Sequence, residues 1–175
     1  GSSIVYLVSS HNGTRINDIG ELWVMDANGD NPHPLSVIGR APSWSPDGQH
    51  IAYMLNRDGL WNIYIYDIAT KHSLQLTNCT TNCRWPAWSP DGQIIIYNTT
   101  TKPNNTVADA LWIIPTSGGN PTRITSGTNA GRPSWSRLKL IAFNSDNGIE
   151  YMHENGSGRA LLIAGNINWG PAWSK

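Results

Sequence analysis

Four copies of one short phrase decide the fold: PSWSPDGQHIAY at residues 42–53, PAWSPDGQIIIY at 86–97, PSWSRLKLIAF at 133–143 and PAWSK at 171–175. Their tryptophans, Trp44, Trp88, Trp135 and Trp173, are 44, 47 and 38 residues apart. A period of about 40–45 residues is typical of propeller blades or solenoid turns, and a unit this small cannot bury a core alone. The repeats are therefore expected to share their cores.

The segments within each repeat follow a constant order. Pro-Asp-Gly is strong turn chemistry, since Pro presets φ, Asp bonds the backbone two residues on and Gly accepts positive φ. It predicts a hairpin between the tryptophan strand and the apolar segment that follows. We expect third strands at Leu22–Asp26, Ile63–Asp67, Leu111–Pro115 and Ile149–His153, and fourth strands near Pro34–Ser36, Ser73–Thr77, Thr122–Thr125 and Ala160–Ile163. One hairpin must turn differently, because Ser136–Lys139 replaces the Ser-Pro-Asp-Gly of the other copies.

Composition favours the same architecture. Nine Trp, one Phe, 17 Gly and 11 Pro are typical of short strands joined by tight turns. No segment keeps the apolar period of a helix, so we expect an all-β chain. Twelve basic and twelve acidic residues cancel without runs of one sign, which argues against nucleic acid as a partner and against membrane insertion.

The repeats also resemble a known family. PSWSPDGQHIAY followed by WNIYIYDIATKHSLQLT, and PAWSPDGQIIIY followed by ALWIIPTSGGNPTRIT, are similar to the TolB-type, WD-like β-propeller repeat of bacterial periplasmic and secreted proteins. The resemblance implies a β-propeller of four-stranded blades, an extracytoplasmic bacterial location and a protein partner. We expect a single domain, 1–175, with blade 1 from 171–175 plus 3–40, blade 2 from 41–85, blade 3 from 86–131 and blade 4 from 132–170.

The two ends of the chain are expected to share one blade. Ile4–Tyr6 matches Ile51–Tyr53, so the segment 171–175 would supply the inner strand of the blade that begins at Ile4. Four blades are few for this family, and three closures stay open. They are a closed four-bladed monomer, an eight-bladed homodimer formed by exchange of the terminal strands, and a fragment of a longer propeller.

Cys79 and Cys83 are the only cysteines. A disulfide can join them if the turn brings their α-carbons within about 7 Å, and two inert thiols are the alternative. No second cysteine pair completes a zinc site. A disulfide would favour an extracytoplasmic protein.

Catalytic motifs are missing from the sequence. The five histidines occupy unrelated positions of different repeats, and the aspartates fit turns rather than a calcium loop. We therefore predict no enzyme activity, no metal and no cofactor.

Arginines and two extra tryptophans are the candidate ligand-binding residues. Arg40 and Arg84 stand two residues before their Pro, and Arg132 stands one before. Their guanidinium groups should converge at one mouth of the central channel, either as an anion or carboxylate site or as side chains that cover the strand ends or pair with a neighbouring Asp. Trp85 and Trp169 precede the phrase without being required by the repeat, so each is either an exposed stacking surface for a ligand ring or a packed side chain. Trp44, Trp88, Trp135 and Trp173 are expected to be structural. The sequence predicts a non-catalytic protein-binding or scaffold module, and the alternative is a lectin-like or small-anion-binding propeller.

Overall fold

The computed structural model describes residues 3–9, 19–100, 110–125, 129–165 and 170–173. In these ranges the chain is all-β, as the composition indicates. The strands are β1 (Ser3–Val8), β2 (Gly20–Asp26), β3 (His33–Trp44), β4 (His50–Arg57), β5 (Leu60–Asp67), β6 (His72–Gln75), β7 (Asn82–Trp88), β8 (Ile94–Thr100), β9 (Ala110–Pro115), β10 (Thr122–Arg123), β11 (Gly131–Trp135), β12 (Leu140–Ser145), β13 (Gly148–His153) and β14 (Ala160–Ala164).

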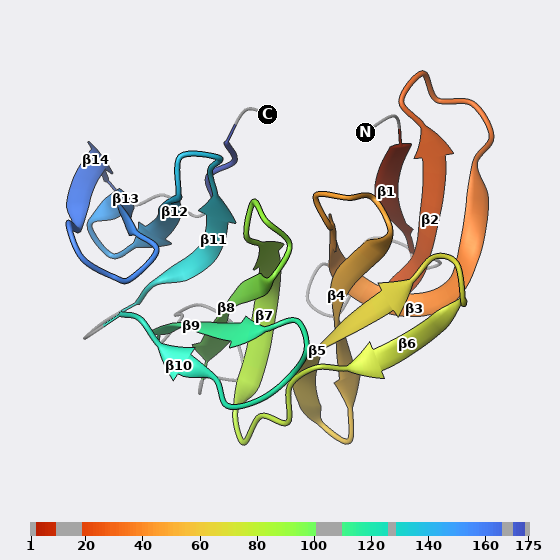
Figure 1. The fold of residues 1–175 in the computed structure, drawn as a ribbon, viewed down its shortest axis with the longest axis horizontal. Coiled ribbons are helices and arrows are strands. Elements are labelled where there is room, and N and C mark those ends of the chain that lie inside the picture. The colour runs from red at the N-terminus through yellow and green to blue at the C-terminus, as the bar shows by residue number, and fades with distance from the viewer. Residues whose placement is uncertain (1–2, 10–18, 101–109, 126–128, 166–169, 174–175) are drawn as a thin grey trace.

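Antiparallel pairing joins the strands into three sheets, ordered β1-β2-β3-β4-β5-β6, β10-β9-β8-β7 and β11-β12-β13-β14. The six-stranded sheet is two blades connected by one long strand. The first half of β3 pairs with β2, and its second half, from Arg40 to Trp44, pairs with β4. Figure 1 shows the sheets following one another from β1 on the right to β14 on the left.

The described residues show no pairing between the two chain ends, which were expected to share one blade. In the described part of the chain β1 pairs only with β2, and Pro171–Trp173 form no strand. The backbone N–H of Trp173 instead donates to Ser134 Oγ at 3.3 Å, which places this segment beside β11 (Figure 1). Trp173 contacts the preceding repeat as Trp88 does, although Trp88 also pairs within its own blade. The blade shared by the two chain ends, the number of blades and the two-chain ring therefore stay predictions.

The hydrophobic cores lie between neighbouring repeats. In β4, Ile51, Tyr53 and Leu55 pack with residues of blade 1, whereas Ala52 and Met54 pack with Trp88 and other residues of the third repeat. A further cluster joins β8 and β9 to β12 and β13. Alternate side chains of one strand thus enter two different cores, which agrees with the expectation that single repeats cannot fold alone.

The Ser-Pro-Asp-Gly turns form through side-chain hydrogen bonds. Ser45 Oγ donates to Asp47 at 2.5 Å and accepts from the His50 backbone at 2.9 Å, while Asp47 also accepts from the Gln49 backbone. Ser89 and Asp91 repeat this arrangement in the next blade. In the variant hairpin Ser136 Oγ accepts from the Leu140 backbone at 3.0 Å. These aspartates therefore stabilise turns.

Lys139 stands where the other two turns have glycine. Its φ is 59°, compared with 71° at Gly48 and 73° at Gly92, and the left-handed region is unfavourable for a residue with a Cβ. Lys139→Gly is expected to raise the free energy of unfolding by about 0.5–1 kcal/mol in urea titrations. The ion pair lost with Glu154 is exposed and contributes little.

Gly92→Ala is the matched control for Lys139→Gly. The nearest atom to an added Cβ at Gly92 is Pro46 Cδ at 3.6 Å, so the methyl group has room and only the backbone conformation opposes it. This variant should be less stable than the wild type by about 1 kcal/mol. Equal stability of Lys139→Gly and the wild type would contradict strain at Lys139.

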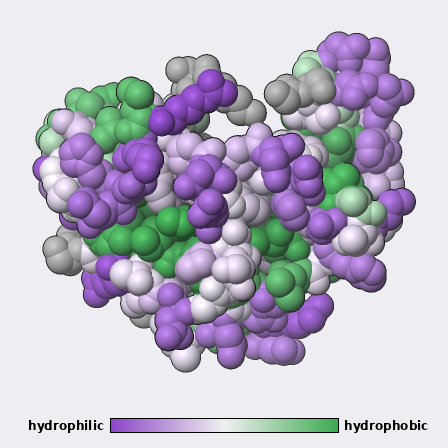
Figure 2. Space-filling model, in the orientation of Figure 1, coloured by the Kyte–Doolittle hydropathy of each residue, from purple (hydrophilic) through white to green (hydrophobic). Residues whose placement is uncertain are grey.

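The face of the molecule drawn in Figure 2 carries hydrophilic residues interrupted by several apolar patches. One of these lies over β14, whose Leu161, Leu162 and Ile163 are each more than half exposed. Within the described residues no helix has the length and apolar character needed to span a membrane.

Candidate functional site: an arginine and tryptophan cluster

Each of the inner strands β3, β7 and β11 carries a β-bulge at the same place. The pairing register shifts between Arg40 and Ser43, between Arg84 and Ala87, and between Gly131 and Ser134. The residue just before proline has positive φ in all three strands, with 50° at Ala41, 54° at Trp85 and 46° at Arg132. Bulges re-aim side chains, and a bulky residue with positive φ is a marked outlier. The repeat thus alters the direction of its inner strands where the arginines lie.

The bulges bring together side chains from three repeats. The guanidinium carbon of Arg132 lies 4.5 Å from the ring centroid of Trp85, and that of Arg40 lies 5.9 Å from the same centroid. The Arg84 guanidinium carbon lies 5.1 Å from the ring centroid of Trp61 in β5. We call Arg40, Arg84, Trp85 and Arg132 the arginine cluster.

Arg84 is a buried cation. Its residue is only 4% exposed, and its Nε is buried without a hydrogen-bond partner among the described residues. Burial and, secondarily, the positive charge of Arg40 lower its pKa to about 10, so the side chain stays protonated at neutral pH. Burial and Arg40 also lower the pKa of Arg132. The cluster therefore concentrates positive charge in a poorly hydrated place.

A disulfide holds the segment that leads into Arg84. Cys79 and Cys83 are joined, with their α-carbons 6.2 Å apart, and Cys83 is 1% exposed. The backbone N–H of Cys79 donates to Asn62 Oδ1 at 2.8 Å, which ties the loop to β5. The cross-link and this hydrogen bond position Arg84 against Trp61, since both lie on the elements so connected.

Sequence reasoning selected the residues of this cluster from their common place in the repeat. The structure brings Arg40, Arg84, Arg132 and Trp85 together. Trp169 lies outside the described residues, but Gly170 packs against Arg132, and a Cβ at Gly170 would approach Arg132 Cβ to 2.6 Å. Trp61 was missed, because only the fold brings β5 under Arg84.

The four repeat tryptophans line a cavity of about 810 Å³. Trp88 Nε1 donates to the Ser43 carbonyl at 2.9 Å, and Trp173 Nε1 donates to the Ser134 carbonyl at 3.1 Å. Both acceptors are the middle residue of Pro-Ser-Trp in the preceding repeat. These tryptophans thus connect neighbouring blades, and the indole nitrogens of Trp44 and Trp135 are buried without a partner in the described part of the chain.

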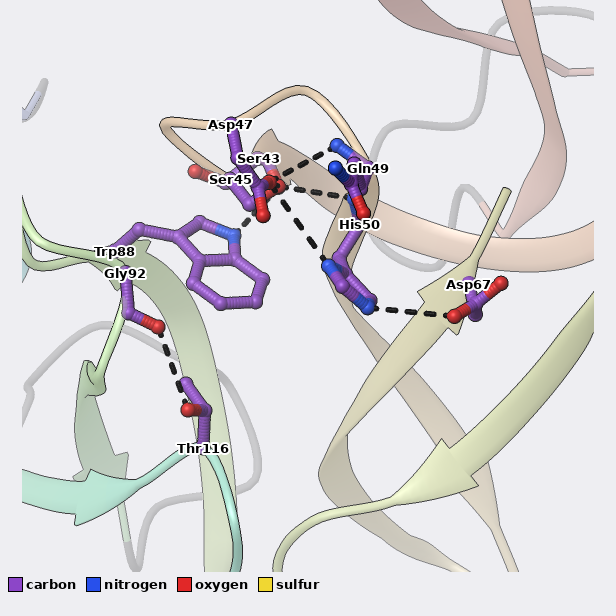
Figure 3. Close-up of polar contacts among 9 residues, drawn as sticks. All are labelled: Ser43, Ser45, Asp47, Gln49, His50, Asp67, Trp88, Gly92 and Thr116. Atoms are coloured by element: carbon purple, nitrogen blue, oxygen red, sulfur yellow. Dashed lines mark hydrogen bonds and ion pairs between the residues drawn. The ribbon is translucent and has the colours of Figure 1, made fainter. Parts of the chain in front are cut away.

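A groove of about 860 Å³ lies between the second and third repeats. Its wall includes His50, whose Nε2 is 3.4 Å from Asp67 and whose Nδ1 is 3.9 Å from Asp47 (Figure 3). The pKa of Asp47 is lowered mainly by the hydrogen bond from Ser45, and that of Asp67 mainly by the backbone of Thr70. Both carboxylates, those of Asp47 and Asp67, thus accept hydrogen bonds within their own turns.

The groove was not predicted from the sequence, in which the histidines occupy unrelated positions of different repeats. Its wall is built from turns of separate repeats, and no single motif marks it. Ser45 Oγ is engaged with Asp47 and the His50 backbone rather than with the imidazole, so this Ser-His-Asp set lacks the geometry of an activated nucleophile (Figure 3). Among the described residues no group of three or more His, Cys, Asp or Glu could hold a metal ion.

Antiparallel sheets linked by repeat tryptophans, with bulged inner strands, define the chain as a β-propeller protein. It belongs to the TolB β-propeller family, whose domain model, described as "TolB beta propeller domain", matches residues 1–175.

Curated relatives match short parts of the chain. The TolB homolog of Protochlamydia amoebophila is 54% identical over 37 residues, which are 21% of this chain and 8% of that protein. The Tol-Pal system protein TolB of Bordetella pertussis is 37% identical over 62 residues, or 33% of this chain and 14% of that protein. The matched parts therefore span only a small share of these relatives.

Solved structures share the fold. Putative TolB from Agrobacterium tumefaciens aligns with a TM-score of 0.70 and 21% identity, covering 81% of this chain and 55% of that one. TolB from Acinetobacter baumannii aligns with a TM-score of 0.70 and 21% identity, and the alignment covers 90% of this chain and 40% of that one. An oligogalacturonate lyase in complex with manganese aligns with a TM-score of 0.62 and 16% identity, and the alignment covers 83% of this chain and 46% of that one. Similarity at this level of identity shows the fold alone.

Proposed function

We propose that this TolB-like propeller is a non-catalytic binding module that recognises a protein partner through the arginine cluster. The observation that carries the proposal is the buried Arg84 beside the half-buried Trp85. Trp and Arg dominate the energetics of protein interfaces, because they supply large rigid contact areas and several hydrogen-bond donors. The cluster presents no nucleophile or general base of its own, which favours binding over chemistry.

The proposed location is extracytoplasmic in a bacterium. The disulfide between Cys79 and Cys83 supports an oxidising compartment, because cytosolic thiols are kept reduced. The relatives from Bordetella and Protochlamydia support a bacterial source. A lectin-like or small-anion-binding role is the second candidate, and the three guanidinium groups of the cluster favour it.

Selection of linear peptides from a phage library on the immobilised domain tests the proposal. A shared consensus should emerge, and the matching synthetic peptide should bind in fluorescence anisotropy. Trp85→Ala should weaken that binding by at least about tenfold, the loss expected for an interface anchor. Trp23→Ala is the control, since Trp23 lies in β2 and bonds to Glu21. Absence of any consensus, or equal binding by both variants, would contradict the proposal.

A further inference from the structure

We infer that the arginine cluster is a carboxylate-binding site, in which Arg84 is the central donor and Arg40 and Arg132 complete the positive surface. This inference deepens the proposed function, because it names the ligand chemistry of the same cluster. The carboxylate is either the side chain of an acidic residue in a partner protein or a free small molecule. Both sources present the same planar group to the guanidinium forks.

Without a bound anion, the buried charge of the arginine cluster destabilises the folded protein, and a bound anion would reduce this destabilisation. Arg84 is 4% exposed and makes no ion pair and no side-chain hydrogen bond within the described part of the chain. A buried charge without a counter-ion is destabilising, and nearby positive charge adds to that cost. Such an arrangement persists in proteins where a ligand supplies the missing charge.

The contact of Arg84 with an aromatic ring leaves a donor available. Its guanidinium carbon lies 5.1 Å from the Trp61 ring centroid, and its Nε has no hydrogen-bond partner in the described part of the chain. A guanidinium that stacks through its face still presents N–H groups in its plane, and these match the two oxygens of a carboxylate. The tryptophans also exclude water, which strengthens charge-assisted hydrogen bonds.

Carboxylate fits this cluster better than phosphate. Phosphate sites commonly use the backbone N–H groups of a helix N-terminus or a glycine-rich loop. Within the described residues the cluster is built from strands with no helix, and its donors are arginine side chains that lie against aromatic rings. The two oxygens of a planar carboxylate match the parallel N–H groups of one guanidinium.

Thermal unfolding with small ligands forms the first arm of the test. Succinate should raise the Tm by at least about 3 °C, and uncharged succinamide at the same concentration should not. Inorganic phosphate and sodium chloride of equal ionic strength measure general ion effects. An equal shift with phosphate or chloride would overturn the carboxylate assignment, as would the absence of any shift in both arms.

The second arm replaces succinate with a capped peptide containing two consecutive glutamates, compared with the same peptide containing glutamines. Binding of the glutamate peptide alone identifies an acidic protein segment as the source. A response to succinate alone identifies a free carboxylate and would contradict the protein-partner function while leaving the carboxylate site intact. Phage-selected peptides that bind without acidic residues would support the partner function and overturn the carboxylate site.

Variants of Arg84 separate a binding role from a structural one. Arg84→Met should abolish the succinate or peptide response and also raise the Tm of the free protein, because a buried cation without a counter-ion is replaced by an apolar chain. Arg84→Lys keeps the positive charge but lacks the paired N–H donors of the guanidinium group, so it should weaken succinate or peptide binding about tenfold. Arg137→Met is the control, since Arg137 is exposed beyond the other end of β11. A lower Tm in Arg84→Met together with unchanged binding would show that Arg84 only packs on Trp61.

Discussion

Replacing Trp88 with alanine is expected to lower the free energy of unfolding by about 3–5 kcal/mol, the range for a large aromatic residue removed from a core. Trp88 is 9% exposed and packs in the cluster that joins the second and third repeats. Its Nε1 also donates to the Ser43 carbonyl at 2.9 Å. The substitution would open a cavity between two blades and leave that carbonyl without its donor. Urea unfolding followed by circular dichroism measures the loss.

Trp173→Ala is the matched comparison. Trp173 makes the same kind of hydrogen bond, from Nε1 to the Ser134 carbonyl at 3.1 Å, but the residue is 36% exposed. Its removal should cost only about 1 kcal/mol, because little apolar area is buried and the acceptor regains water. Equal losses of unfolding free energy in Trp88→Ala and Trp173→Ala would contradict this difference in burial. That outcome would instead indicate that a further strand covers Trp173, as the exchanged dimer requires.

The fold could be predicted well where the chemistry is local. Pro-Asp-Gly specifies its own turn, so the hairpin from Trp44 to His50 and its equivalent from Trp88 follow from a few adjacent residues. The third strands lie where the spacing predicts them, in β2, β5, β9 and β13. The fourth strands differ at their ends, because β6 ends at Gln75 and β10 at Arg123, although strands to Thr77 and Thr125 were expected.

The bulges could not be predicted from local rules. Positive φ at Ala41, Trp85 and Arg132 is imposed by pairing within each blade, and none of these residues is a glycine that would mark it. The proline after each of them would have misled the prediction, because proline favours extended backbone with negative φ at the preceding residue.

The candidate site was only partly predictable from the sequence. Equivalent repeat positions explain why the arginines converge. The partner of Arg84 could not be inferred, because Trp61 lies in a different element.

Glu150→Gln is expected to lower the free energy of unfolding by about 2 kcal/mol at neutral pH. Glu150 is 5% exposed, and its carboxylate accepts hydrogen bonds from Ser145 Oγ at 2.5 Å and from the Arg159 guanidinium. Hydrogen bonds to a charged acceptor contribute about 1.5–3 kcal/mol. A neutral amide keeps the shape but loses the ion pair, and it presents an N–H₂ group to the guanidinium. Chemical unfolding at pH 7 measures the difference.

The pH dependence of this difference identifies its origin. The hydrogen bond from Arg159 is the largest cause that lowers the pKa of Glu150 below its ordinary value of 4.5, although burial opposes it. Because the folded pKa is the lower one, the stabilisation is complete above about pH 4.5 and is lost as the pH falls through the folded pKa. The wild type and Glu150→Gln should therefore converge in acid.

Glu154→Gln is the control for the Glu150 experiment. The Glu154 carboxylate lies 3.4 Å from Lys139 Nζ, but the two side chains are 41% and 68% exposed. Such exposed pairs contribute about 0–1 kcal/mol, because water and salt screen them and both side chains lose rotamer freedom. The control should thus show a small effect that added salt removes. If Glu150→Gln behaved the same way, or if its cost persisted unchanged down to pH 3, the buried ion pair would not be the source of the stability.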